Sequence, residues 1–192
     1  THHSTLDISV LRGMPNLSIY NPSDCASTRL SILDAHKNSS PSYIRLEKGI
    51  LPTLHKENFD LSDGFRTLKL GNDIALVSTG HIGHTASELC EQLNEAGYST
   101  GHIDIIRLKP LSGESLLRIL RKFKRVFVLE EQVPTGGISD LIARLIIESG
   151  AELQMKGFTL PENPIYEYGT RDWLKHKYKL SADEIFLRIT EI

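Results

Sequence analysis

Cysteine, long apolar runs and a surplus of either charge are all scarce in this chain of 192 residues. Its two cysteines, Cys25 and Cys90, lie within predicted helices and fit no metal-ligand spacing, so we expect two reduced, buried thiols. No apolar run approaches the roughly 20 residues that cross a bilayer. The 22 basic and 24 acidic residues leave a net charge of −2, without the surplus typical of nucleic-acid binding. We therefore predict a cytoplasmic protein that binds neither nucleic acid nor membrane.

Common catalytic motifs are missing as well: we find no Ser-His-Asp order, no paired catalytic carboxylates and no P-loop. The segment Thr79–His84 follows a predicted strand and opens a helix, whose first N–H groups can bind an anion. Its glycine spacing is not Gly-x-Gly-x-x-Gly, however, and His81 and His84 lack the glutamate of zinc hydrolases. We interpret this segment as a tight turn that packs a strand against a helix.

Short β-branched runs and longer amphipathic runs alternate along the chain. In the first part, Asp24 is a suitable N-cap for a helix over residues 25–36, with an apolar face of Leu30, Ile32 and Leu33. A strand follows over residues 42–46. We predict that residues 1–49 form a partial α/β unit with two strands, and that residues 50–72, which show no clean helical period, form a linker.

From residue 73 onward, predicted strands and helices alternate regularly. Residues 74–78 form a continuous apolar run, typical of a parallel strand that is buried on both faces. Strand-helix alternation after this run implies an α/β fold, a mostly parallel open sheet with helices on both faces. We predict a second domain over 73–192, with strands at 74–78, 99–106, 125–130 and 153–158 and helices at 86–96, 113–123, 138–149, 173–178 and 182–190.

Several short motifs near the start of the chain occur in a familiar order. Thr1-His2 precedes a predicted helix that ends in Leu11-Arg12, a Pro-Asn turn, a strand and a Pro-x-Asp helix start at Pro22. Residues 43–49 read Tyr-Ile-Arg-Leu-Glu-Lys-Gly. This order resembles the end of the pyrimidine-binding domain of thiamine-diphosphate enzymes in the transketolase family. The remainder resembles the transketolase C-terminal domain, so the resemblance covers nearly the whole chain.

The resemblance implies a C-terminal fragment or subunit of an enzyme that transfers a two-carbon ketol unit between sugar phosphates. The parent enzyme would use thiamine diphosphate and a divalent metal such as Mg. Two sister activities share this architecture: 1-deoxyxylulose-5-phosphate synthase and the β-subunit of 2-oxo-acid dehydrogenases. The stretch Pro41–Gly49 looks more like transketolase than either of them. A non-catalytic assembly or regulatory module is a further alternative.

Three residues are candidates for the substrate site. In the family, a histidine at the position of His2 lines the substrate channel and hydrogen-bonds the sugar donor, so His2 is the candidate catalytic residue, and His3 is its less specific neighbour. The other interpretation of this pair is a tag remnant or exposed turn residues. Similar enzymes place an arginine at the position of Arg45 to hold a phosphate, which suits its forked, permanently charged side chain. The alternative is an ordinary surface arginine.

The sequence also lacks the cofactor-binding part of the family pattern. The Gly-Asp-Gly motif with an asparagine about thirty residues later, which holds the diphosphate through a metal ion, does not occur. Neither is there a match to the glutamate that activates the aminopyrimidine ring. We therefore expect the chain alone to bind no cofactor and to be inactive. Its expected partners are the N-terminal diphosphate-binding part of the same enzyme and a second copy in a homodimer.

Overall fold

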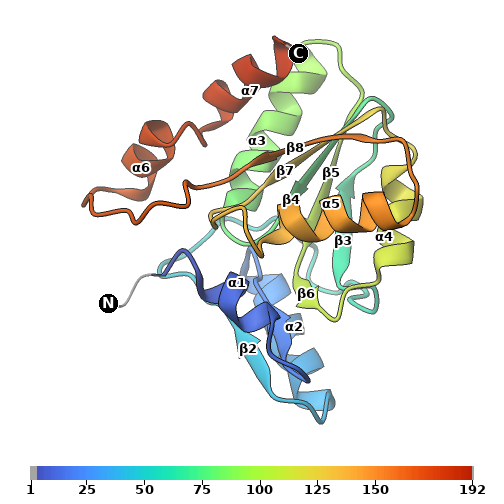
Figure 1. Ribbon diagram of the computed structural model, residues 1–192, viewed down its shortest axis with the longest axis vertical. Helices are drawn as coiled ribbons and strands as arrows, with labels where there is room; N and C mark the ends of the chain where they lie inside the picture. The colour runs from blue at the N-terminus through green and yellow to red at the C-terminus, as the bar shows by residue number, and fades with distance from the viewer. Residues whose placement is uncertain (1–3, 192) are drawn as a thin grey trace.

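Two β-sheets organise the chain in the computed structural model, which describes residues 4–191 (Figure 1). The larger sheet has five strands in the order β3-β5-β4-β7-β8. All its neighbouring pairs are parallel except β3 with β5. The strands of this sheet are β3 (Phe65–Lys69), β4 (Ile74–Ser78), β5 (Thr100–Ile105), β7 (Arg125–Leu129) and β8 (Gln154–Phe158). The predicted fold class, a mostly parallel α/β sheet with flanking helices, is confirmed.

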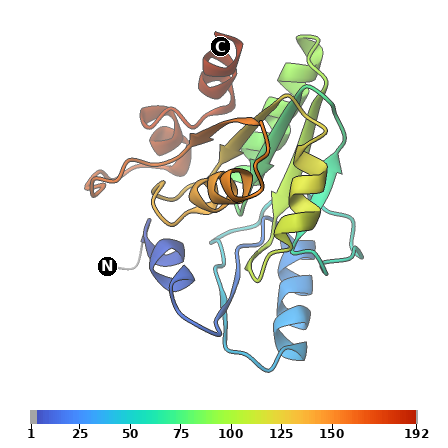
Figure 2. The ribbon, with the colours of Figure 1, turned by 45° about the vertical axis from the view of Figure 1, so that its right-hand side comes forward.

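Helices cover both faces of the large sheet (Figures 1 and 2). Helices α3 and α7 pack on one face, and α4 and α5 pack on the other. The seven described helices are α1 (Asp7–Arg12), α2 (Cys25–Lys37), α3 (Ile82–Glu95), α4 (Gly113–Leu120), α5 (Ile138–Glu148), α6 (Arg171–Lys177) and α7 (Ala182–Thr190).

Strand β4 shows why both faces need cover. All five of its residues are buried, as the uninterrupted apolar run predicts. Successive side chains point to opposite faces of a sheet. Ala75 and Val77 therefore join the core under α4 and α5, whereas Ile74 and Leu76 join the core under α3 and α7. At about 25 cal/mol per Å² of apolar surface, such burial is the main favourable contribution to folding.

The smaller sheet joins the two predicted parts of the chain. Strand β1 (Ser18–Tyr20) pairs in parallel with β2 (Ser42–Ile44) and antiparallel with β6 (Arg107–Lys109). The two strands expected from residues 1–49 are therefore present, but a strand from the second part completes their sheet. In Figure 1 this sheet and helices α1 and α2 lie beneath the large sheet. The division into residues 1–49, 50–72 and 73–192 stays a prediction.

The second half of the expected linker contains a strand that the sequence did not predict. Strand β3 lies within residues 50–72 and forms an edge of the large sheet. This strand pairs antiparallel with β5, which is distant in the sequence, so no local hydrophobic periodicity could predict the pairing. The first half of the segment also packs against the rest of the protein, because His55 in it is buried.

Helix α2 and its first residue differ from expectation as well. Asp24 caps the helix as predicted, and its side chain accepts from the backbone N–H of Ser27. The expected apolar face is wrong, because Ile32 and Leu33 are 50% and 42% exposed while the buried residues of the helix are Ser27 and Ser31. Close packing of this helix uses serine side chains. Cys25 is exposed rather than buried, and Cys90 is buried as expected.

Candidate functional site

Arg45 lies directly after β2, at the carboxyl end of a parallel strand. Ligands of open α/β sheets bind at this end of the strands. Its side chain is 18% exposed and lies among charged and polar groups from its own stretch of chain and from three other segments, namely α1, the residues after β7, and α6. We call this set the Arg45 cluster: Asp7, Tyr43, Arg45, Glu47, Glu131, Gln132 and Arg171.

Two carboxylates lie beside Arg45, but neither forms a hydrogen bond with it. Its Nε lies 3.7 Å from Oδ2 of Asp7 and 4.0 Å from Oε1 of Glu47. These separations are well beyond the 2.7–2.9 Å of a charge-assisted hydrogen bond. Among residues 4–191, no protein group hydrogen-bonds the terminal nitrogens of Arg45. Within the described part of the chain, the forked end of the guanidinium thus has no hydrogen-bond partner.

Asp7 is held by neighbours other than Arg45. The Tyr43 hydroxyl donates to its Oδ2 at 2.8 Å, and Nε2 of Gln132 donates to its Oδ1 at 2.6 Å. Burial, followed by the hydrogen bond to Asp7, raises the pKa of Tyr43 to about 12, so Tyr43 stays a donor at neutral pH. These bonds connect α1, β2 and the segment after β7 around Arg45.

Glu47 has its own partner on the opposite side. Nη2 of Arg171, the first residue of α6, donates to Oε2 of Glu47 at 2.5 Å. Nη1 of Arg171 lies 3.6 Å from Oε2 of Glu131. Burial raises the pKa of Glu131 above its ordinary value, although the nearby Arg171 acts against that shift. One arginine thus connects two carboxylates from separate strand ends.

His81 lies near the same group of charges. Burial, followed by the positive charges of Arg171 and Lys175, lowers the pKa of His81 to about 4. The imidazole is therefore neutral at pH 7. The preceding Gly80 has a φ of +69°, and a Cβ there would lie 2.5 Å from the side-chain nitrogen of Asn21. This close approach supports the interpretation of residues 79–84 as a tight packing turn.

The candidate residues His2 and His3 lie outside the described residues. Of the three candidates, only Arg45 can be placed, and it lies at a strand's carboxyl end as the sequence suggested. Sequence reasoning missed Glu47, Gln132 and Arg171. Glu47 stands two residues after Arg45 and offered a local signal, but Arg171 is 124 positions from Glu47 and offered none.

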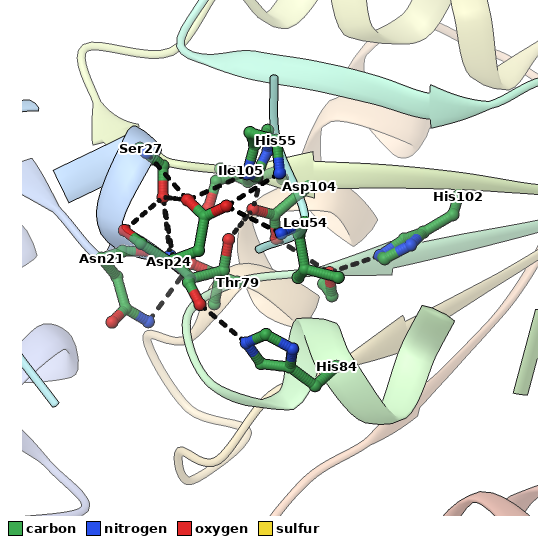
Figure 3. A network of polar contacts seen from close by, with 12 residues as sticks. Asn21, Asp24, Ser27, Leu54, His55, Thr79, His84, His102, Asp104 and Ile105 are labelled. Atoms are coloured by element: carbon green, nitrogen blue, oxygen red, sulfur yellow. Dashed lines mark hydrogen bonds and ion pairs between the residues drawn. The ribbon is translucent and has the colours of Figure 1, made fainter. Parts of the chain in front are cut away.

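A second polar group lies in the interior, between the first part of the chain and the large sheet (Figure 3). We call it the buried network: Ser23, Asp24, His55, Ser78, His102 and Asp104. Oδ2 of Asp24 accepts from the backbone N–H groups of Leu54 and His55, each at 2.8 Å. The carboxylate that caps α2 therefore also holds the following segment in place.

His55 lies between two buried carboxylates (Figure 3). Its Nδ1 is 3.2 Å from Oδ1 of Asp24, and its Nε2 is 3.5 Å from Oδ2 of Asp104. Burial works against ionisation of Asp24, but contacts with His55 and Ser27 outweigh it and lower the pKa of that carboxyl. An imidazole in this position connects α2 to β5 across the interior.

Asp104 completes the buried network. It accepts from the hydroxyls of Ser23 at 2.6 Å and Ser78 at 2.9 Å. Because Ser78 donates to Asp104, its Oγ accepts from Nε2 of His102 at 2.8 Å. Burial raises the pKa of Asp104 to about 6 and lowers that of His102 to about 3. These hydrogen bonds satisfy polar groups that would otherwise be costly inside a protein.

The turn between β7 and α5 is covered within the chain itself. Glu130 accepts from the backbone N–H groups of Ile138 and Ser139, at 2.7 and 2.9 Å, and so caps α5. Arg12 of α1 donates to the carbonyl of Gly136 at 2.5 Å. Helix α1 therefore packs against this turn through Arg12 and Ser9.

The described residues do not fit a diphosphate-binding metal site. Residues 4–191 contain no group of three or more His, Cys, Asp or Glu side chains placed to hold a metal ion. The sequence has no Gly-Asp-Gly motif to supply one.

None of the described helices is long and apolar enough to span a membrane.

Comparison with known proteins identifies relatives of this arrangement. The family model described as "Transketolase, C-terminal domain" matches residues 64–185. One of the subunits of the apulose-4-phosphate transketolase of Actinobacillus succinogenes is 30% identical over 186 residues, which cover 96% of this chain and 60% of that protein. The 1-deoxy-D-xylulose-5-phosphate synthase of Bacteroides fragilis is 29% identical over all of this chain and 30% of its own length.

A solved structure shows the same fold over nearly the whole chain. The structure titled "Split gene transketolase, inactive beta4 tetramer" superimposes with a TM-score of 0.90 and 26% identity. The match covers 99% of this chain and 62% of the other. The chain therefore spans about three fifths of these two relatives, and under a third of the synthase.

Proposed function

This chain belongs to the transketolase family, and from that premise we propose that it works as the C-terminal part or subunit of an enzyme that transfers a two-carbon ketol unit between sugar phosphates. The observation that carries the proposal is the open guanidinium of Arg45 at a strand's carboxyl end, inside a chain of this family. The relative from Actinobacillus succinogenes is named as one subunit of a transketolase, which supports a chain that acts beside another.

In this proposal the cofactor is held by the partner. Thiamine diphosphate and a divalent metal such as Mg would supply the bond-making chemistry. The described residues of this chain do not fit their diphosphate site, so the chain's own contribution is to bind and orient the substrate. The partner would be the N-terminal diphosphate-binding part, and a homodimer of the assembled enzyme is part of the same proposal.

Arg45 would bind the phosphate group of a sugar phosphate. Two parallel N–H groups of a guanidinium match two phosphate oxygens, and the charge persists at every relevant pH. The nearest carboxylates stand 3.7 and 4.0 Å from its Nε, so a phosphate need not displace a tight ion pair. His2 would contact the ketose donor next to the reacting carbon, with His3 beside it.

The test uses the complete enzyme, assembled from this chain and its cofactor-binding partner. Arg45→Ala should raise KM for phosphorylated acceptors about tenfold to a hundredfold, because a charged hydrogen bond is worth roughly 1.5–3 kcal/mol. The same variant should leave an unphosphorylated acceptor unaffected. His2→Ala should instead slow turnover of the ketose donor. Unchanged constants in both variants would contradict the proposed site.

A second candidate activity is supported by the synthase relative. The 1-deoxy-D-xylulose-5-phosphate synthase of Bacteroides fragilis matches the whole chain at 29% identity. Product analysis separates the two activities, because only a synthase would form 1-deoxy-D-xylulose 5-phosphate. A 2-oxo-acid dehydrogenase β-subunit and a non-catalytic module remain further alternatives. An adjacent reading frame that carries the diphosphate motif would favour a catalytic subunit over the module.

A further inference from the structure

Arg45 has two acidic neighbours that should compete with a phosphate for its guanidinium. A carboxylate and a phosphate are recognised by the same forked donor. Glu47 is the nearer competitor in the chain, because it follows Arg45 by two residues and its Oε1 is already 4.0 Å from Nε of Arg45. Another contact in the fold must therefore keep the carboxylate of Glu47 from moving into hydrogen-bond distance of Arg45.

Arg171 provides this restraint. Its Nη2 hydrogen-bonds Oε2 of Glu47 at 2.5 Å, far shorter than the 4.0 Å between Glu47 and Arg45. The carboxylate of Glu47 is 13% exposed, so water screens these charges only in part. The second competitor, Asp7, is restrained in the same manner by Tyr43 and Gln132.

The position of Arg171 is itself supported from two directions. Its Nη1 lies 3.6 Å from Glu131, which extends from the end of β7. Thr170 caps α6 by accepting from the backbone N–H of Trp173, which places the start of the helix. Arg171 is therefore held where it can bind Glu47, although it lies in the last quarter of the chain.

We infer that Arg171 is a positioning residue for the substrate site: by holding Glu47 away from Arg45, it keeps Arg45 free to bind the phosphate of a sugar phosphate. This inference rests on the proposed phosphate role of Arg45. It assigns a substrate-binding task to α6, whose Arg171 contacts Glu47 and Glu131. Without Arg171, Glu47 would turn toward Arg45 and compete with the phosphate.

The experiment compares kinetic constants of the assembled enzyme with ribose 5-phosphate and with unphosphorylated ribose as acceptors. Arg171→Met should raise KM for ribose 5-phosphate about fivefold, the size expected when one partly exposed ion pair changes partner. It should leave KM for ribose and kcat unchanged. Inorganic phosphate, used as a competitive inhibitor, should bind more weakly by the same factor.

A second variant separates positioning from simple damage to the fold. Adding Glu47→Gln to Arg171→Met should restore KM for ribose 5-phosphate, because a neutral amide no longer competes by charge, whereas a misfolded site would stay impaired. Arg171→Lys should give an intermediate value. Arg144→Met serves as the matched control, since Arg144 pairs with Glu148 at 2.7 Å on the exposed face of α5.

The outcomes distinguish this inference from the proposed function. If Arg45→Ala raises KM for ribose 5-phosphate while Arg171→Met does not, the positioning role is overturned and the phosphate role stands. Failure of Glu47→Gln to rescue a folded Arg171→Met enzyme also overturns it. If Arg45→Ala has no effect, both ideas fall together.

Discussion

The Arg45 cluster and the buried network contain similar side chains in different surroundings. In both, carboxylates from separate segments converge on a nitrogen base, Arg45 in one and His55 in the other. His55, Asp24 and Asp104 are closed off from water, with side chains 0% exposed. In the Arg45 cluster the side chains are partly exposed, and Arg171 reaches 37%.

The two groups also differ in hydrogen bonding, because Asp104 in the buried group has more close partners than Arg45 in the partly exposed one. Asp104 has both oxygens occupied by serine hydroxyls within 2.9 Å, while Arg45 has only the two long contacts of its Nε. A buried charge without partners costs several kcal/mol, so the carboxylates of an interior network need hydrogen-bond donors. The two ring nitrogens of His55 have the carboxylates of Asp24 and Asp104 at 3.2 and 3.5 Å but no hydrogen bond within the described residues. A binding site must instead keep one group unsatisfied for its ligand. The geometry of the buried network suits stability, and the geometry of the Arg45 cluster suits the substrate-binding role that we propose for it.

The largest effect that would test this contrast is the loss of Asp104. Asp104→Ala should lower the free energy of unfolding by about 3–5 kcal/mol, because it leaves His55 and two serine hydroxyls buried without their acceptor. Asp104→Asn should cost less, since the amide oxygen still accepts. Urea unfolding followed by circular dichroism measures both. The exposed Asp172→Ala is the control, and equal effects in the three variants would contradict a special role for the network.

The next effect concerns pH and His102. Its folded-state pKa of about 3 lies below the ordinary 6.5, so between these values the unfolded chain binds the proton and acid destabilises the fold. Asp104 acts in the opposite sense from about pH 4 to 6, because its pKa is raised to about 6. The loss of stability caused by His102→Gln should therefore be largest at neutral pH. It should shrink by about 1.4 kcal/mol per pH unit below pH 6.5.

Unfolding titrations of the wild-type and His102→Gln chains at pH 7, 6 and 5 check this slope. A difference in stability that does not vary over this range would show that His102 takes up its proton at the same pH in the folded and unfolded chains. The contrast between an interior network and a solvated cluster would then lose its electrostatic basis.

The smallest effect is expected in the Arg45 cluster. Arg171→Met should change the free energy of unfolding by less than about 1 kcal/mol, because partly exposed ion pairs contribute little. Its consequence should appear in KM for a phosphorylated substrate instead. A stability loss as large as that of Asp104→Ala would place Arg171 with the structural network and weaken its assignment to the substrate site.

Local sequence predicted much of the scaffold. The apolar run over β4 announced a strand buried on both faces, and Asp24 announced the start of α2. Both depend on neighbours within a few residues, through period and capping. The apolar face expected for α2 was wrong because periodicity shows which side of a helix is apolar but not what lies against it. Ile32 and Leu33 are exposed in the structure.

The sequence by itself determined the α/β alternation, the family and the placement of Arg45 at the end of a strand. Only the tertiary structure decided that β6 completes the small sheet, that His55 is buried between two carboxylates, and that Arg171 holds Glu47. The physical reason is the distance along the chain over which each interaction acts. Strand and helix propensities act over a few residues, whereas these contacts join segments that are distant in the chain, and only the packing of both sheets brings them together.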